Sequence, residues 1–309
     1  MALSIGRAVG RWRQGILGLL LSGAFLWSVP GAAMNFDPVT QDPPPRAPGP
    51  SLESAAIPSG AVALNAVFYL PGGEAPAPVV LLLHGLPGEE RNQDLAQVLR
   101  RAGYAVLLPH YRGAWGSPGS FSFRHCLADI DAMLRWLDAP AVQARFRLDA
   151  QPRALVGHSM GGYLALRAGA GHPRVSTLVS MAGPDFGIMA EALAADDAAA
   201  RATAERFEGW VAGPLAGTSG AALVAELTED PRFFSLAARA GLFVGQRVTL
   251  VAGSEDAYVS PARLEKLQGA LVTAHSPAKL ETLPGDHAFS SVRLALARVV
   301  LAALGEAGP

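Results

Sequence analysis

Cysteine is nearly absent from this chain of 309 residues, in which Cys126 is the only one. No disulfide can form within the chain, so the fold must rely on a hydrophobic core. Half of the residues are hydrophobic, which is enough for a core of substantial size. We expect the thiol of Cys126 to be buried and inert, because no neighbouring residue in the sequence would lower its pKa.

Charged side chains are scarce and balanced. They make up 17% of the chain, and the formal net charge is −1. A chain without an excess of positive charge has little to hold a phosphate backbone, so nucleic acid is not an expected partner. Histidine and cysteine are not grouped at the spacing of zinc ligands, and no metal site is expected.

Long hydrophobic runs are confined to the N-terminus. Arginines up to Arg13 precede an apolar stretch from Gly15 to Val29, and Gly31 and Ala33 follow at the spacing of a cleavage site. The stretch is shorter than the roughly 20 residues that a membrane-spanning helix needs. Residues 1–33 are therefore predicted to be a secretory signal peptide, with an uncleaved membrane anchor as the alternative. In either case the arginines predict that the rest of the chain is exported, to the periplasm or beyond the cell.

Proline dominates residues 34–50, which are predicted to form a linker. A Pro-rich sequence is extended, and we do not expect it to join a packed core. The folded domain is predicted to span residues 51–309, and it contains no visible internal repeat.

Short apolar runs alternate with helical patterns along this domain. Strands are predicted within residues 61–70 and at 78–83, 104–108, 154–156, 177–182, 248–252 and 279–283. Helices are predicted over residues 92–102, 126–137, 163–170, 262–271 and 291–304. The alternation predicts an α/β fold with a mostly parallel central sheet flanked by helices. Residues 185–245 interrupt it, and their Ala-rich composition predicts helices inserted over one end of the sheet.

One predicted strand passes directly into a helix through Gly157-His158-Ser159-Met160-Gly161. Such a sharp turn needs glycine on both sides of its central residue, because side chains there would collide. The central residue, Ser159, then projects near a helix N-terminus and is a candidate nucleophile. The alternative is a Gly-rich turn in which Ser159 only caps the helix.

A serine nucleophile needs a histidine base and a carboxylate that orients the histidine. In open α/β sheets, functional groups gather at the carboxyl ends of strands, so the partners should follow strands. Asp256 follows the strand at 248–252 and is the first choice for the acid, with Glu255 as the second. His287 follows the strand at 279–283 and is the candidate base, whereas Asp286 is interpreted as a loop acid. The alternative for Asp256 and His287 is a role as solvated loop residues.

Two backbone donors are needed to stabilise an oxyanion. The N–H of Met160 directly follows the candidate nucleophile, and the N–H of Leu86 lies in a Gly-rich loop after the strand at 78–83. His84 is expected to shape that loop, and His158 is expected to pack inside the elbow.

Three residues of another Gly-rich loop are candidates for lining the entrance to the site. They are Arg112, Trp115 and Phe121. Core packing would explain the two aromatic side chains equally well, so both interpretations stay open.

These motifs resemble those of the α/β-hydrolases over about residues 60–305. Within that superfamily, residues 111–123 resemble a loop of the prolyl-oligopeptidase-like branch and of related esterases and acyl-peptidases. The resemblance implies the α/β-hydrolase fold, with residues 185–245 as a helical lid, and it implies no cofactor. It also implies a catalytic triad and an oxyanion hole, formed by Ser159, Asp256 and His287 and by the N–H groups of Leu86 and Met160.

Two departures from the prolyl oligopeptidases bear on the expected reaction. Those enzymes carry a propeller before the hydrolase domain, whereas only the targeting segment and the linker precede it here, so gating by a propeller is not expected. They also typically have tyrosine at the position of Met160. The expected function is hydrolysis of a carboxylic ester, with a small-molecule or peptide acyl substrate. A serine peptidase or amidase is the alternative, and a non-catalytic binding member of the fold is a less favoured one.

Overall fold

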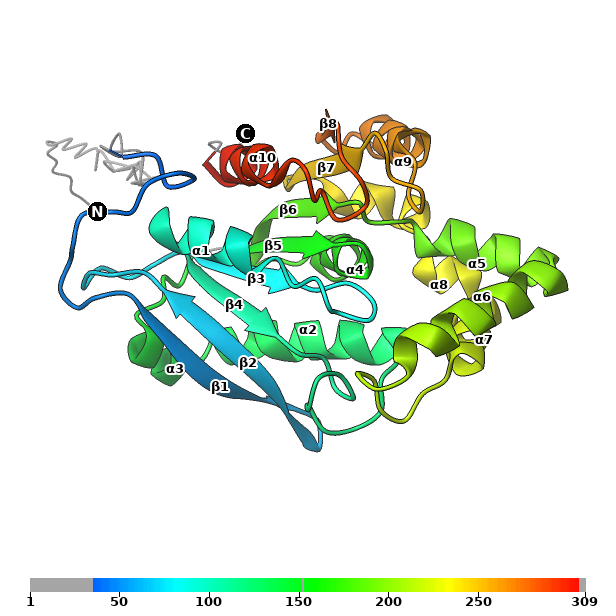
Figure 1. Ribbon diagram of the computed structural model, residues 1–309, viewed down its shortest axis with the longest axis horizontal. Coiled ribbons are helices and arrows are strands. Elements are labelled where there is room, and N and C mark those ends of the chain that lie inside the picture. Colours follow the sequence, from blue (N-terminus) through cyan, green and yellow to red (C-terminus); the bar gives the residue numbers. More distant parts are fainter. Residues whose placement is uncertain (1–35, 152, 306–309) are drawn as a thin grey trace, which may run out of the picture. The chain divides into compact units, whose positions relative to one another are not determined.

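The computed structural model describes residues 36–151 and 153–305 (Figure 1). The predicted signal peptide or anchor, residues 1–33, lies outside these ranges. Among the helices within them, none combines the length and the apolar character that crossing a membrane requires.

An eight-stranded sheet forms the centre of the described chain. Its spatial order is β1 (Ser51–Ser59), β2 (Val62–Leu70), β4 (Ala105–Pro109), β3 (Val79–Leu83), β5 (Arg153–His158), β6 (Val175–Met181), β7 (Arg247–Gly253) and β8 (Ala278–Leu283). β1 and β2 form an antiparallel hairpin, β2 is antiparallel to β4, and all other neighbours are parallel. The predicted mostly parallel sheet is confirmed. β1 was not predicted, because this edge strand is largely exposed along one side and has no continuous apolar run.

The order of the strands reverses at β3, which pairs with β4 on one side and with β5 on the other. In open α/β sheets, ligands bind in the crevice outside the carboxyl ends of the strands at such a reversal. The loop after β3 carries Leu86, and the turn after β5 carries Ser159. The topology therefore brings the predicted donor loop and the predicted nucleophile to the same point of the sheet edge.

Helices cover both faces of the sheet. On one face, α1 (Gln93–Arg101) and α10 (Arg293–Gly305) pack on the core with side chains such as Leu99 and Val300. The other face is covered by α2 (Phe123–Leu137), α3 (Pro140–Phe146), α4 (Met160–Gly169) and α9 (Pro261–Thr273). The strands β3, β4 and β5 are buried along their whole length because they lie between these two layers. α3 is too short to show a helical period, and the sequence analysis missed it.

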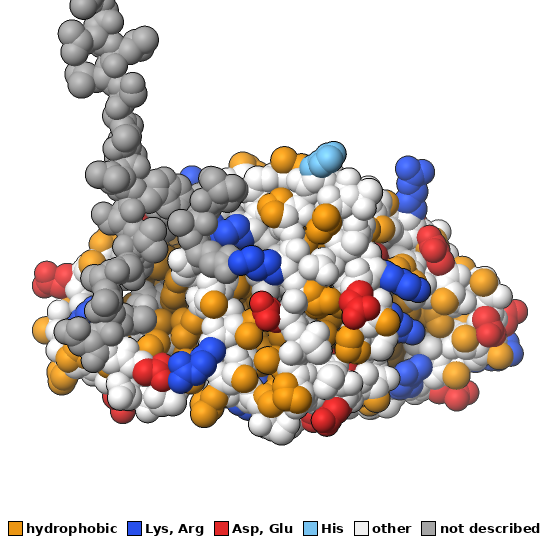
Figure 2. Space-filling view, turned by 90° about the horizontal axis from the view of Figure 1, so that it is seen from above, with side chains coloured by type: hydrophobic (Ala, Val, Ile, Leu, Met, Phe, Trp, Pro, Cys, Tyr) orange, Lys and Arg blue, Asp and Glu red, His pale blue; other side chains and the backbone are white. Residues whose placement is uncertain are grey.

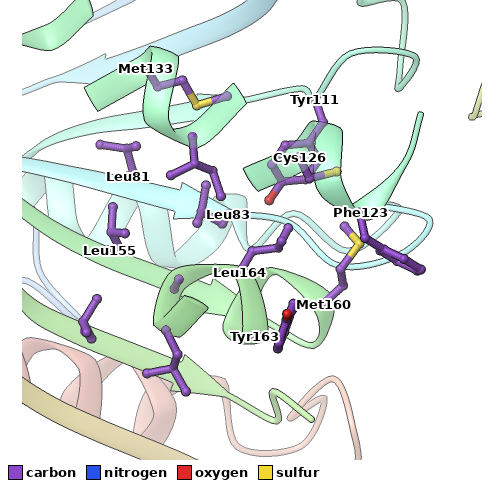
Figure 3. Close-up of a cluster of buried hydrophobic side chains, with 14 of the residues drawn as sticks. Leu81, Leu83, Tyr111, Phe123, Cys126, Met133, Leu155, Met160, Tyr163 and Leu164 are labelled. Carbon is purple, nitrogen blue, oxygen red and sulfur yellow. The ribbon is translucent and has the colours of Figure 1, made fainter. Parts of the chain in front are cut away.

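The core beside the start of α4 is tightly filled (Figure 3). The side chain of Met160 lies next to the ring of Phe123, and both side chains are buried. Cys126 is fully buried close to Tyr111. Burial raises the pKa of the Cys126 thiol well above its ordinary value, so the predicted burial is confirmed and the thiol is unreactive at neutral pH.

The start of the Pro-rich segment contributes to the core. Val39 is only 5% exposed and packs within the cluster formed with α1 and α10. Arg101 Nε donates to the carbonyl of Pro38 at 2.7 Å, and Arg298 pairs with Asp37 at 2.8 Å. The prediction that the linker stays out of the packed core is therefore wrong for residues 37–39, because one apolar side chain and two arginine contacts are enough to hold the segment.

Residues 185–245 are helical, as predicted. They form α5 (Phe186–Ala195), α6 (Asp197–Val211), α7 (Gly220–Glu229), α8 (Pro231–Phe234) and a 3₁₀ helix, η1 (Ala237–Phe243), between β6 and β7. In Figure 1, α5 to α8 lie beyond the arrowhead of β5. The rings of Phe186, Phe207 and Phe234 pack edge-on against Phe123, and Glu226 accepts from the backbone N–H of Phe123 at 2.9 Å. The inserted helices are thus anchored to the start of α2.

The face of the molecule in Figure 2 carries charges of both signs. Figure 2 views the molecule from above relative to Figure 1 and shows Lys and Arg side chains interspersed with Asp and Glu. This distribution agrees with the formal net charge of −1.

A buried ion pair ties the loop after β4 to α2. The Asp129 carboxylate is fully buried and accepts from Arg112 N and Nε at 2.8 Å each and from Ser59 Oγ at 2.7 Å. We expect Asp129→Ala to lower the free energy of unfolding by about 3 kcal/mol, because it leaves the Arg112 guanidinium without its partner. Urea unfolding measures this change.

Asp131→Ala is the matched control for that measurement. Asp131 pairs with Arg135 on the exposed side of the same helix. Its loss should cost about 0.5 kcal/mol or less, because an exposed pair is screened by solvent. Equal losses for the two variants would contradict a stabilising role of the buried pair.

Candidate active site

Ser159 sits at the junction of β5 and α4 with a strained backbone. Its φ is 55° and its ψ is −122°, a conformation that side-chain-bearing residues rarely adopt. Its N–H donates to the carbonyl of Met181 at 2.8 Å, which holds the turn against β6. The Ser159 side chain makes no capping hydrogen bond to α4. Ser159 thus occupies the N-cap position of α4 but does not cap the helix through its side chain.

Glycines make this elbow sterically possible. A Cβ on Gly157 would lie 2.0 Å from the carbonyl oxygen of Gly161, and a Cβ on Gly161 would lie 2.1 Å from that of Leu83. Because both obstacles are backbone atoms, they cannot rotate away. The turn can form only where both positions lack a side chain.

We expect Gly161→Ala to lower the free energy of unfolding by about 3 kcal/mol, since the added methyl forces the elbow away from β3. Gly209→Ala is the matched control, because a Cβ at this exposed position of α6 meets nothing within 4 Å. It should stabilise the protein by up to about 1 kcal/mol through helix propensity. Urea unfolding of both variants tests the steric argument, and a harmless Gly161→Ala would refute it.

The structure brings Ser159, His287 and Asp256 into one series of hydrogen bonds. His287 Nδ1 lies 2.8 Å from Asp256 Oδ2, and His287 Nε2 lies 2.9 Å from Ser159 Oγ. An ionised carboxylate only accepts, so Nδ1 is the donor to Asp256 and the hydroxyl of Ser159 donates to Nε2. This arrangement gives Ser159 a base that can take its proton.

Asp256 is held in its charged form. Burial alone raises the pKa of its carboxyl, but hydrogen bonds from His287 and from the N–H groups of Val259 and Tyr258 outweigh burial, and the pKa lies below its ordinary value. Those two N–H groups donate to Oδ1 at 2.9 and 2.7 Å. The carboxylate is fully buried, while His287 retains 22% side-chain exposure. Asp256 can therefore orient His287 and stabilise its charged form.

The two neighbouring acids take other positions. Glu255 is exposed, and its backbone N–H donates to Gly285. Asp286 accepts from the N–H of Ser290 at 2.8 Å in an exposed turn before α10. Of the acids considered, Asp256 is the one in contact with His287.

The loop after β3 lies directly against Ser159. A Cβ on Gly85 would be 3.1 Å from the Cβ of Ser159, so the backbone that leads to Leu86 passes close to the hydroxyl. Trp115 Nε1 donates to the carbonyl of Pro87 at 2.8 Å and holds the loop from outside. Met160 buries its side chain and begins α4, whose first N–H groups have no partner within the helix. Both predicted donors are thus carried by backbone next to Ser159.

His158 has a position that the sequence analysis did not predict in full. It is buried inside the elbow, as expected, but its Nε2 also donates to the carbonyl of His287 at 2.7 Å. Burial lowers the pKa of His158 to about 4, so its ring is neutral at physiological pH. His158 therefore connects the serine turn to the loop that carries His287. No signal in the sequence indicated this contact.

His84 is not part of the hydrogen-bonded series. Its Nδ1 donates to the carbonyl of Gly85 at 2.8 Å, and burial lowers its pKa to about 3. This position agrees with the expectation that His84 shapes the loop after β3.

Three residues were considered for the entrance to the site, and two of them make other contacts in the structure. Phe121 is 2% exposed and packs in the core, and Arg112 is bound to Asp129. Trp115 is half-buried, with the guanidinium of Arg91 above its ring. Core packing therefore explains Phe121, and Trp115 supports the loop after β3. In residues 36–151 and 153–305, no group of three or more His, Cys, Asp or Glu side chains could hold a metal ion.

Comparison with known proteins agrees with this architecture. Residues 78–223 match the family model described as the alpha/beta hydrolase fold. No curated protein matches the sequence.

Solved structures share the fold at low sequence identity. An acylaminoacyl peptidase of Pyrococcus horikoshii is 16% identical with a TM-score of 0.60, and the match covers 82% of this chain but only 41% of the peptidase. The Est1E protein of Butyrivibrio proteoclasticus, solved with ferulic acid bound, is 18% identical with a TM-score of 0.61, over 82% of this chain and 100% of that one. An esterase of Pyrococcus furiosus is 17% identical with a TM-score of 0.61, over 84% and 96%.

The family model, the sheet order and these structures all support the resemblance seen in the sequence motifs. The described chain has the alpha/beta hydrolase fold.

Proposed function

We propose that this chain is a serine hydrolase that cleaves carboxylic esters through an acyl-enzyme. The observation that carries the proposal is the series of hydrogen bonds from Asp256 through His287 to Ser159. A serine hydroxyl bonded to an imidazole that a buried carboxylate orients is the arrangement used for nucleophilic acyl transfer.

The reaction begins when His287 Nε2 takes the proton of Ser159 and Oγ forms a bond to the acyl carbon. The N–H groups of Met160 and Leu86 donate to the oxyanion that develops. The bond from the acyl carbon to the leaving oxygen then breaks, and this oxygen departs as an alcohol with the proton from His287. Water attacks the acyl carbon in the same way, the acid is released, and the proton returns to Ser159. Asp256 stays ionised and stabilises the imidazolium.

The substrate is proposed to be a small-molecule or peptide acyl compound. Two of the structural neighbours are named as an esterase and as an acylaminoacyl peptidase, so both reactions occur on this fold. Met160 favours ester cleavage, because the prolyl-oligopeptidase-like enzymes that the sequence resembles typically have tyrosine there. Peptide or amide hydrolysis by the same three residues is the second candidate, supported by the peptidase neighbour.

The test is a panel of p-nitrophenyl esters of varied chain length beside aminoacyl-naphthylamides. A fluorophosphonate probe, followed by peptide mapping, locates the nucleophile. We expect ester turnover to exceed amide turnover and the label to lie on Ser159. Faster amide turnover would favour the peptidase. Absence of both turnover and label would favour a non-catalytic binding role.

Two further parts of the proposal concern the inserted helices and the N-terminal segment. The helices α5 to α8 are proposed to act as a lid, because they lie beyond the carboxyl end of β5 in Figure 1. The N-terminal segment is proposed to direct export to the periplasm or beyond, with an uncleaved membrane anchor as the alternative. The N-terminal sequence of the mature protein distinguishes cleavage from anchoring.

A further inference from the structure

An exposed aromatic ring lies beside the imidazole of His287. Tyr258 is 54% exposed, and its ring is 5.1 Å from that of His287 in an edge-to-face arrangement. The other ring recorded against His287 within the described ranges is that of His158, which is buried. Tyr258 is therefore the ring on the accessible side of the base.

The position of Tyr258 is set by the acid of the series. Its N–H donates to Asp256 Oδ1 at 2.7 Å, so the carboxylate that orients His287 also fixes the backbone of Tyr258. No hydrogen bond of its phenolic hydroxyl is recorded among the residues that the structure describes. The ring of Tyr258 thus presents a large apolar surface beside His287, and its hydroxyl is free to bind another group.

A second ring extends this surface toward the inserted helices. Trp210 of α6 lies 6.4 Å from Tyr258, again edge-to-face, and is half-buried. It is anchored by the ring of Phe207, 5.5 Å away, which is 6% exposed. Tyr258 and Trp210, which we call the aromatic rim, come from segments on opposite sides of β7 in the chain.

The mechanism determines which part of a substrate meets this rim. His287 must give its proton to the leaving oxygen, so that oxygen lies within hydrogen-bond distance of Nε2. The substituent on the leaving oxygen then lies beside whatever ring flanks His287 on its exposed side, which is Tyr258. The acyl carbon, bonded to Ser159, lies toward Met160 and Leu86.

We propose that the aromatic rim is the binding site for the leaving group and that it selects esters of aromatic alcohols or phenols. This inference rests on the proposed function and names the substrate class for it. An aromatic leaving group gains ring contacts with Tyr258 and Trp210 that a methyl group cannot make. Because the leaving group departs after acylation, the rim contributes to formation of the acyl-enzyme and not to its hydrolysis.

The test compares phenyl and methyl esters of one acyl group, the one that the ester panel shows to be turned over fastest. The ratio of their kcat/KM values in a variant, divided by that in the wild type, cancels the different intrinsic reactivities. Tyr258→Ala should lower kcat/KM about fivefold for the phenyl ester and by less than about twofold for the methyl ester. Trp210→Ala should change the ratio in the same direction. Tyr258→Phe keeps an aromatic ring and should therefore retain most of the preference for the phenyl ester.

Two further measurements exclude a purely structural effect. Hydrolysis of the common acyl-enzyme should be unchanged in Tyr258→Ala, whereas a displaced His287 would slow it for both esters. Leu52→Ala removes a similarly exposed apolar side chain on β1 and should leave the ratio unaltered. An unchanged ratio in Tyr258→Ala, or equal losses for both esters, would overturn the inference while ester cleavage by the wild type still stands. If the wild type neither cleaves esters nor reacts with the fluorophosphonate, the proposed function fails and the inference falls with it.

Discussion

Ser159→Ala is expected to reduce kcat for every substrate by about 10⁵-fold or more, down to the rate that binding and the oxyanion donors alone support. The physical reason is that the variant keeps His287 and Asp256 in place but has no oxygen to form the acyl-enzyme. Steady-state turnover of the best p-nitrophenyl ester measures the loss. Fluorophosphonate labelling of the variant should disappear in parallel.

Ser254→Ala is the matched control for that result. Ser254 is an exposed serine on the loop after β7, the loop that also carries Asp256. It should retain both turnover and labelling. Urea unfolding should show that Ser159→Ala is folded, because the substitution removes one hydroxyl and its hydrogen bond to His287 but leaves the backbone of the elbow unchanged. A Ser159→Ala protein with near-normal turnover would show that another group is the nucleophile.

Asp256→Asn is expected to lower kcat by about 10⁴-fold at neutral pH. The amide can donate a hydrogen bond to Nδ1, which favours the tautomer of His287 that carries its proton on Nε2. That tautomer cannot accept the proton of Ser159. The carboxylate charge that would stabilise the imidazolium is lost as well. Turnover of the same ester measured against pH tests this expectation.

Asp286→Asn provides the comparison. Asp286 is adjacent to His287 in sequence, but its carboxylate accepts from Ser290 in an exposed turn. We expect less than about a threefold change in kcat, in line with the small effect of exposed charges. If Asp286→Asn is as damaging as Asp256→Asn, the assignment of the acid to Asp256 is wrong.

The helices and strands with strong local patterns could be predicted from the sequence. β3 is a continuous apolar run, β5 has the apolar centre 154–156, and α1 places its buried residues on one face. Elements without such a pattern were missed, namely β1, which is a partly exposed edge strand, and the short helix α3. The linker residue Val39 was also misjudged, because its burial depends on α1 and α10, which are distant in the chain.

Some parts of the candidate site could likewise be predicted from the sequence, and others could not. The sequence by itself determined the elbow, since Gly157 and Gly161 flank Ser159. The clash at Gly157 is local, because it involves the backbone of Gly161, whereas the clash at Gly161 involves Leu83 on β3. It also narrowed the partners to residues that follow strands, because parallel strands end at one edge of the sheet.

Only the tertiary structure decided which of those residues meet. The choice of Asp256 over Glu255 depends on which side chain turns inward to His287, a contact between segments 31 positions apart. The bond from His158 to His287 and the placement of Tyr258 beside the imidazole depend on how separate loops pack together. The glycines that allow the turn can be recognised in the local sequence, whereas these contacts arise from packing of the whole sheet. The candidate nucleophile could therefore be predicted from the sequence, whereas the side chains around it that would select a substrate could not.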